Sequence, residues 1–190
     1  MIFREMKNMD CIGKYITKDG DSTDTMSEQV LGVVFDGTDK ELLFLPFFDV
    51  DYCHNRYHSL QEVIEIAEDF NRQHHNGHIR WSLPTLADWK AIIRNLGKTD
   101  VFEKNALDMC DRMQGWGEFD GKTAVNNLRK YRLDSKSTYW SSTEGYEEEV
   151  YLLDLGMGTV EAYPMFDDGE EDDNVLRLIG RVSKNKESEK

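Results

Sequence analysis

The densest cluster of chemically active side chains is an acidic segment near the C-terminal end of the chain. Carboxylate oxygens are the ligands that calcium prefers, but their spacing here does not follow the calcium-loop pattern D-x-[DN]-x-[DN]-G-x5-E. Like charges crowded on one loop more often face solvent. We therefore expect no bound cofactor, with calcium as the alternative. The six carboxylates are Asp167, Asp168, Glu170, Glu171, Asp172 and Asp173.

A second group of metal-ligating residue types lies at 49–58, where Asp49, Asp51, Cys53, His54 and His58 combine carboxylate, thiol and imidazole. The spacing matches no tetrahedral zinc pattern. We interpret the segment as a polar loop and expect no metal there.

Three further histidines, His74, His75 and His78, follow a predicted helix. They could bind a metal, but cationic rings beside a helix C-terminus, with Gly77 following, are stabilised by the helix dipole alone. We favour the capping interpretation.

The cysteines Cys11, Cys53 and Cys110 are odd in number and widely spaced, and no CxxC motif occurs. This pattern argues against a disulfide framework. Cys110 falls on a predicted helical stripe, where we expect a buried, inert thiol.

The formal net charge of −14 is concentrated in one part of the chain, because residues 137–176 hold twelve Asp or Glu and no Lys or Arg. Coulomb repulsion opposes binding of nucleic acid or an anionic membrane through that surface. No apolar run reaches the length of a membrane helix. The charged N-terminus does not resemble a secretion signal, so we expect a cytoplasmic location by default.

The segment 81–89 organises the rest of the chain. Pro84 keeps the preceding residues extended, and Thr85 with Asp88 forms a capping box that starts a helix over 86–96. Trp89 lies on the apolar stripe of that helix, so we expect it in the core. Gly97 stands where a left-handed C-terminal residue is favoured.

Other helices are predicted from apolar residues at helical spacing. A serine-to-glutamate capping box at 59–62 starts the clearest of them, which continues to about residue 70. Residues 102–113 and 123–131 are two further predicted helices, with a loop at 114–119 between them. Trp116 in that loop is either an anchor returning to the core or an exposed contact residue.

Alternating apolar residues and glycine turns predict strands elsewhere. We expect an edge strand at 11–16, a hairpin from 30–35 and 42–45, and a β-rich C-terminal third with a second hairpin. In the closing strand, 175–182, Arg177 and Arg181 are predicted to face away from the apolar side. The strands of the C-terminal third are 139–143, 150–155, 159–163 and 175–182.

Three blocks carry a resemblance to a known family: 81–89 (W-S-L-P-T-L-A-D-W), 139–144 (Y-W-S-S-T-E) and 176–181 (L-R-L-I-G-R). In order and spacing they resemble bacterial C-type lectin-like domains related to formylglycine-generating enzymes. The resemblance implies an α+β fold with two main helices on a mixed, mostly antiparallel sheet and long loops. The resemblance covers roughly residues 10–183, within a single predicted domain at 1–183 that is followed by a charged tail at 184–190.

The chain departs from the family pattern at several points. Ser82 replaces an arginine, Asp88 replaces a glutamate, and Gly180 adds a residue that we interpret as a bulge in the closing strand. The oxidase relatives use a cysteine pair near the C-terminal end, and this chain has no cysteine after Cys110. The G-N-V-W-E-W motif and the calcium-dependent sugar-binding tripeptides Glu-Pro-Asn and Gln-Pro-Asp are also missing.

The resemblance therefore implies a non-enzymatic recognition module for a protein or glycan, whose oligomeric state is open. It also leaves a cell-surface or secreted location open beside the cytoplasmic default. The alternative is an enzyme, either a thiol oxidase relative using Cys53 or Cys110 or a metal-assisted hydrolase using the histidine-bearing loops. The predicted contact residues are three aromatic side chains together with the acidic segment: Trp116, Phe119, Tyr146, Asp167, Asp168, Glu170, Glu171, Asp172 and Asp173.

Overall fold

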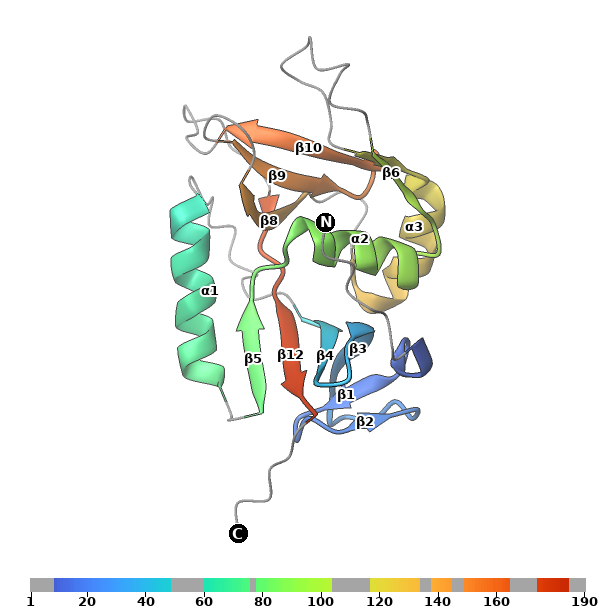
Figure 1. Cartoon of the computed structure of the whole chain (residues 1–190), viewed down its shortest axis with the longest axis vertical. Helices are drawn as coiled ribbons and strands as arrows, with labels where there is room; N and C mark the ends of the chain where they lie inside the picture. The colour runs from blue at the N-terminus through green and yellow to red at the C-terminus, as the bar shows by residue number, and fades with distance from the viewer. Residues whose placement is uncertain are drawn as a thin grey trace.

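The last strand of the chain is inserted into a sheet that the N-terminal half builds. The computed structural model describes residues 9–48, 60–75, 78–103, 117–133, 138–144, 149–164 and 174–184. The first sheet has the order β2-β1-β3-β4-β12-β5, and all neighbouring strands are antiparallel. The C-terminal β12 thus lies between β4 and β5 (Figure 1). These strands are β1 (Tyr15–Thr17), β2 (Ser22–Thr23), β3 (Val30–Gly37), β4 (Glu41–Pro46), β5 (Ile79–Ser82) and β12 (Ile179–Ser183).

A second six-stranded sheet has the order β11-β8-β9-β10-β7-β6. Among its described strands only β11 and β8 are parallel. The predicted hairpin of β9 and β10 is confirmed, and Gly158 in its turn has the positive φ of 74° that glycine tolerates best. The strands are β6 (Val101–Glu103), β7 (Gly117–Phe119), β8 (Thr138–Glu144), β9 (Glu149–Asp154), β10 (Thr159–Pro164) and β11 (Asn174–Val175).

Three α-helices complete the described part of the chain, giving an α+β fold. Helix α1 (Leu60–His74) stands beside β5, and the Asn71 side-chain oxygen accepts the Trp81 backbone N–H at 2.7 Å (Figure 1). The clearest predicted helix is thereby confirmed, although Ser59 of its predicted cap lies outside the described residues. A short 3-10 turn, η1 (Met9–Cys11), precedes β1. None of the described helices has the length and apolar character needed to span a bilayer.

Helix α2 (Leu86–Asn95) begins as predicted. The Thr85 hydroxyl accepts the Asp88 N–H, and the Asp88 carboxylate accepts the Thr85 N–H. The end of the helix differs from the prediction, because Lys98 and not Gly97 has the left-handed φ, at 59°. A glycine is needed at position 97 for another reason, since a Cβ there would lie 2.5 Å from the Ile93 carbonyl oxygen.

Helix α3 (Gly121–Leu128) continues into a 3-10 turn, η3 (Arg129–Tyr131), so the helix predicted at 123–131 is confirmed. Asp120 caps its first turn by accepting the Thr123 N–H. The hydrogen bond from the Thr123 hydroxyl is the largest cause that holds the pKa of Asp120 below its usual value. The stabilisation from this cap is therefore present near neutral pH and is lost as the pH falls through the pKa of the folded state.

Two predictions between α2 and α3 are wrong in the described residues. Val101–Glu103 is strand β6, although Phe102 was predicted to begin a helix, and Gly117–Phe119 is strand β7, although a loop was predicted. These three-residue strands pair with each other, and β7 also pairs with β10. Pairing with a distant strand thus overrides the local helical spacing.

Alternate residues of β3 and β4 point into two cores on opposite faces of the first sheet. Val33 and Leu43 belong to the core that contains α2 and α3, whereas Val34 and Phe44 belong to the core that contains α1. The second sheet contributes to both cores in the same way. Trp89 is completely buried, which confirms its predicted place in the core.

The predicted closing strand is divided into β11 and β12 by residues 176–178. Arg177 is fully buried, so the prediction that it faces away from the core together with Arg181 is wrong. Gly180 is not a bulge, because β12 pairs in continuous register with both β4 and β5. Glycine is required because a Cβ at position 180 would lie 2.1 Å from the Phe44 ring.

Candidate functional site

Most of the predicted contact residues lie outside the described residues. Phe119 is the exception. It is 7% exposed and belongs to the core that contains α2 and α3, so we remove it from the contact surface. The residues of which the structure gives no description are Trp116, Tyr146, Asp167, Asp168, Glu170, Glu171, Asp172 and Asp173.

Two of the strands that precede those residues, β8 and β10, end at the same end of the second sheet, because Glu144 pairs with Val150 and Val150 pairs with Tyr163. Because β9 is antiparallel to β8 and β10, and β7 is antiparallel to β10 and β6, strands β6, β8 and β10 all run in one direction. The described strands that precede the segments 104–116, 145–148 and 165–173 therefore have the same direction. Strand β6 ends elsewhere on the sheet, because Glu103 pairs with Gly117 and Gly117 pairs with Val160, which lies at the start of β10.

The three blocks that carry the family resemblance lie directly against one another. The Trp89 indole N–H donates to the Trp140 carbonyl at 3.0 Å, and the Ser142 N–H donates to the Pro84 carbonyl at 2.9 Å. Arg181 of the third block donates to the Asp88 carboxylate at 3.2 Å. The motifs therefore form the junction between α2 and the two sheets.

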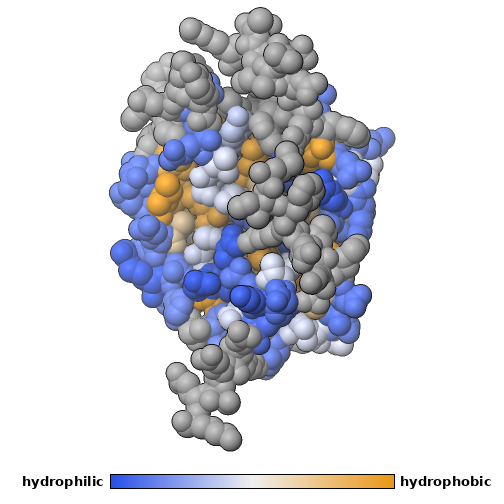
Figure 2. Space-filling view, in the orientation of Figure 1, coloured by the Kyte–Doolittle hydropathy of each residue, from blue (hydrophilic) through white to orange (hydrophobic). Residues whose placement is uncertain are grey.

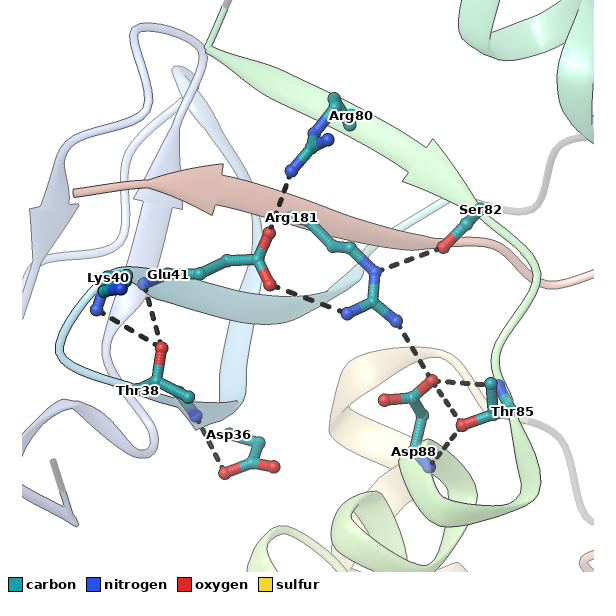
Figure 3. Close-up of polar contacts among 10 residues, drawn as sticks. Asp36, Thr38, Lys40, Glu41, Arg80, Ser82, Thr85, Asp88 and Arg181 are labelled. Atoms are coloured by element: carbon teal, nitrogen blue, oxygen red, sulfur yellow. Dashed lines mark hydrogen bonds and ion pairs between the residues drawn. The ribbon is translucent and has the colours of Figure 1, made fainter. Parts of the chain in front are cut away.

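Arg181 is the centre of a polar network at this junction (Figure 3). Its guanidinium lies 3.6 Å from one Glu41 oxygen and 3.2 Å from Asp88 Oδ2, and it is 3.4 Å from the Ser82 hydroxyl. Arg80 approaches the other Glu41 oxygen at 3.3 Å. Asp88 Oδ2 also accepts the Thr85 N–H and hydroxyl. Each carboxylate accepts hydrogen bonds or ion pairs from groups of the protein itself. We therefore interpret the network as a structural one that joins β12 to β4 and to the start of α2.

We expect Asp88 and Arg181 of this network to be strongly coupled in their contribution to the free energy of unfolding. In a double-mutant cycle of Asp88→Asn and Arg181→Met, the coupling free energy should be about 1–3 kcal/mol, because Asp88 is only 3% exposed. The exposed pair Asp69 and Arg72 on α1, with side chains 54% and 73% exposed, is the matched control, for which we expect at most about 0.5 kcal/mol. Urea unfolding of the variants in both cycles measures the two coupling free energies. Equal values in the two cycles would contradict a structural role of the network.

The histidine- and cysteine-bearing segments form no metal centre in the described part of the chain. There, no group of three or more His, Cys, Asp and Glu side chains could hold an ion. The loop at 49–58 and Cys110 lie outside the described residues, and Cys11 is half-buried. His74 has its Nδ1 3.0 Å from the Phe70 carbonyl oxygen, a contact with the last helical turn of the kind that the capping interpretation expects.

An aromatic pocket between α1 and the first sheet was missed by sequence reasoning. Its volume is about 380 Å³, which lies in the range of small-molecule sites. Its walls come from the β1–β2 turn, β3, the residues after β4, α1 and β5. It is lined by Lys18, Leu31, Phe48, Phe70, His74, Ile79 and Trp81.

The rings of this pocket hold one another in place. Trp81 lies 5.5 Å from Phe48 and 5.6 Å from Phe70, centroid to centroid, and the Phe70 ring is perpendicular to it at 88°. The His74 ring stacks on Phe70 at 4.1 Å and 17°. Figure 2 shows hydrophobic side chains toward the middle of the face drawn in Figure 1 and hydrophilic ones toward its margins. The lining residues are far apart in the sequence, so only their individual aromatic character could have indicated the pocket.

Comparison of the chain with known proteins finds no matching family model, no matching curated protein and no matching solved structure.

Proposed function

We propose that this chain is a non-enzymatic recognition module that binds a protein or glycan partner through the connections of its second sheet. The observation that carries the proposal is that β8 and β10 end at the same end of the second sheet, where Glu144, Val150 and Tyr163 lie in one row. The segments that contain Tyr146 and the acidic residues follow these two strand ends in the sequence, whereas the segment with Trp116 follows β6, which ends beside the start of β10. A rigid sheet with variable connections at one end is a common arrangement for binding.

We further propose that the scaffold is a C-type lectin-like fold. The three motif blocks that carry the resemblance contact one another, which supports this assignment. The helices α1 and α2 and the mostly antiparallel strands agree with the architecture that the resemblance implies. The third helix, α3, is an addition to the two main helices that the resemblance implies.

Negative charge at this end of the second sheet favours a cationic partner. Glu144 and Glu149 stand at the described ends of β8 and β9. Burial, and secondly the Glu149 carboxylate, raise the pKa of Tyr151 above its ordinary value. The acidic residues between β10 and β11 add further negative charge in sequence, which should speed encounter with a basic peptide or an aminated glycan.

The proposal is tested by screening the full chain on peptide and glycan arrays and then reversing charges. For a ligand found in this way, the variant E170K, E171K, D172K and D173K should weaken binding by about tenfold or more at low ionic strength. The control variant E28K, D39K, E65K and E68K reverses four exposed charges on other elements, and we expect it to retain binding within about twofold. An array without hits, or equal losses in the two variants, would contradict the proposal.

A further inference from the structure

We propose that the turn between β1 and β2 is a site of spontaneous isoaspartate formation, at Asp19. In this reaction the Gly20 backbone nitrogen attacks the carboxyl carbon of the Asp19 side chain. The new N–C bond closes a succinimide ring, and the amide proton and the carboxyl OH leave as water. When water opens the ring at the main-chain carbonyl, the peptide bond runs through the side chain and the main-chain carbonyl becomes a free carboxylate. Solvent water is the only reactant, and the modification does not depend on the recognition function proposed above.

The reaction is favoured where glycine follows aspartate, because a Cβ on the second residue hinders the approach of its nitrogen. The described part of the chain holds three such pairs: Asp19–Gly20, Asp36–Gly37 and Asp120–Gly121. The pair Asp168–Gly169, like Asn76–Gly77, lies outside the described residues. Because the three pairs have the same residue types, only their surroundings can make them react at different rates.

The Asp19–Gly20 pair is the least restrained of the three. Asp19 is exposed, and no described residue donates a hydrogen bond to its carboxylate. Gly20 has a φ of 79°, and its N–H donates to the Thr17 carbonyl at 2.9 Å. The nitrogen must give up this one hydrogen bond, in an exposed turn, before it can reach the carboxyl carbon. Local opening of such turns costs little free energy.

The Asp36–Gly37 pair is restrained by the first sheet. Asp36 and Gly37 belong to β3, both pair with residues of β4, and Gly37 is buried. The Gly37 N–H donates to Asp36 Oδ1 at 2.8 Å, so the two reacting groups are close. This hydrogen bond keeps the proton on the nitrogen that would have to attack, and the strand pairing opposes the backbone rotation that closes the ring. The reaction there requires opening of paired strands.

The Asp120–Gly121 pair is restrained by helix α3. The Asp120 carboxylate accepts the Thr123 hydroxyl at 2.6 Å and the Thr123 N–H at 3.0 Å. These hydrogen bonds, the hydroxyl first, hold the pKa of Asp120 below its usual value. Its carboxyl is therefore seldom in the neutral form from which water can leave. Gly121 is buried, and a Cβ there would lie 3.0 Å from the Gly158 backbone, so its nitrogen has little freedom to move.

The modification would loosen the edge of the first sheet. An isoaspartate at position 19 adds a methylene group to the main chain within the turn. The lengthened chain no longer fits the hydrogen bond from Gly20 to Thr17, nor that from the Thr17 N–H to the Asp21 carbonyl at 2.9 Å. The turn also lies next to β12, since a Cβ at Gly20 would be 3.2 Å from Val182 Cγ1.

The proposal is tested by prolonged incubation of the full chain in heavy-oxygen water at mildly acidic pH, where carboxyl groups begin to protonate. Each ring opening incorporates one heavy oxygen atom, and the endoproteinase Asp-N cleaves before aspartate but not before isoaspartate. Mass spectrometry of the digest therefore locates and quantifies the product. We expect Asp19 to react at least about tenfold faster than Asp36 or Asp120, because its turn opens most readily. No reaction at Asp19, or an equal or faster reaction at Asp36 or Asp120, would overturn the proposal.

Two controls separate the effect of structure from that of sequence. In concentrated urea the three pairs should react at rates within about threefold of one another, because the folded contacts are lost. The same order and spread of rates in urea as in the folded protein would refute the structural argument. Asp19→Glu lengthens the side chain by one methylene group, which disfavours ring closure. It should remove the reaction at this position and leave Asp36 and Asp120 unchanged, with a melting curve to establish that the variant folds. Heavy oxygen still entering at position 19 would contradict the assignment.

Discussion

Replacing Arg177 with methionine should lower the free energy of unfolding by about 4 kcal/mol. The guanidinium is fully buried, and its Nη2 donates to the Pro46 carbonyl at 2.5 Å and to the Tyr131 carbonyl at 3.0 Å. Methionine fills much of the space but cannot donate, so two buried carbonyl groups lose charge-assisted hydrogen bonds. Each such bond contributes about 1.5–3 kcal/mol.

Urea unfolding of three variants tests this expectation. Arg177→Lys should fall between wild type and Arg177→Met, because a lysine ammonium cannot reproduce the planar fork of donors. Arg129→Met, at an exposed arginine of η3, is the control and should change stability by at most about 0.5 kcal/mol. If Arg177→Met were as stable as wild type, the two carbonyl contacts would not be the reason for a charge at this position.

Replacing Gly180 with alanine should cost about 3 kcal/mol, because the new methyl group would overlap the Phe44 ring. The closest approaches would be 2.1 Å to two ring carbons. The ring cannot move freely, since it packs edge-on against Trp81 at 5.4 Å. A glycine on β12 thus accommodates an aromatic side chain of its neighbour β4.

A second substitution distinguishes this overlap from a general intolerance of the strand. In the Phe44→Leu background the overlap is removed, so Gly180→Ala should cost less than about 1 kcal/mol there. Thermal unfolding of the four proteins in the cycle measures the difference. The same cost in both backgrounds would place the constraint in the backbone of β12 and not in the Phe44 ring.

Local chemistry accounts for the elements that were predicted correctly. The Thr85 and Asp88 cap of α2, the apolar stripe of α1 and the glycine turn between β9 and β10 all involve residues within a few positions of each other. Such patterns can be recognised in short segments of sequence, because capping and turn formation depend on neighbouring side chains and backbone groups. The family resemblance also rests on sequence alone, and it remains a prediction.

The candidate sites depended much more on the tertiary structure. Phe119 was predicted as a contact residue from its loop-like surroundings, yet pairing of β7 with β10 places it in the core. The aromatic pocket joins Phe48, Phe70 and Trp81, which no periodic pattern connects. Only the pairing of β8 and β10 with β9 shows that the strands before Tyr146 and before the acidic segment end at the same end of a sheet.

The amino-acid sequence by itself determined where the main helices and hairpins form, and it determined the uneven distribution of negative charge. The tertiary structure decided that Arg177 is buried, that Gly180 faces an aromatic ring and that β12 lies between β4 and β5. The physical reason is the distance along the chain. A cap or a turn is satisfied by its neighbours, whereas burial and strand pairing depend on residues more than a hundred positions away, as Pro46 is from Arg177.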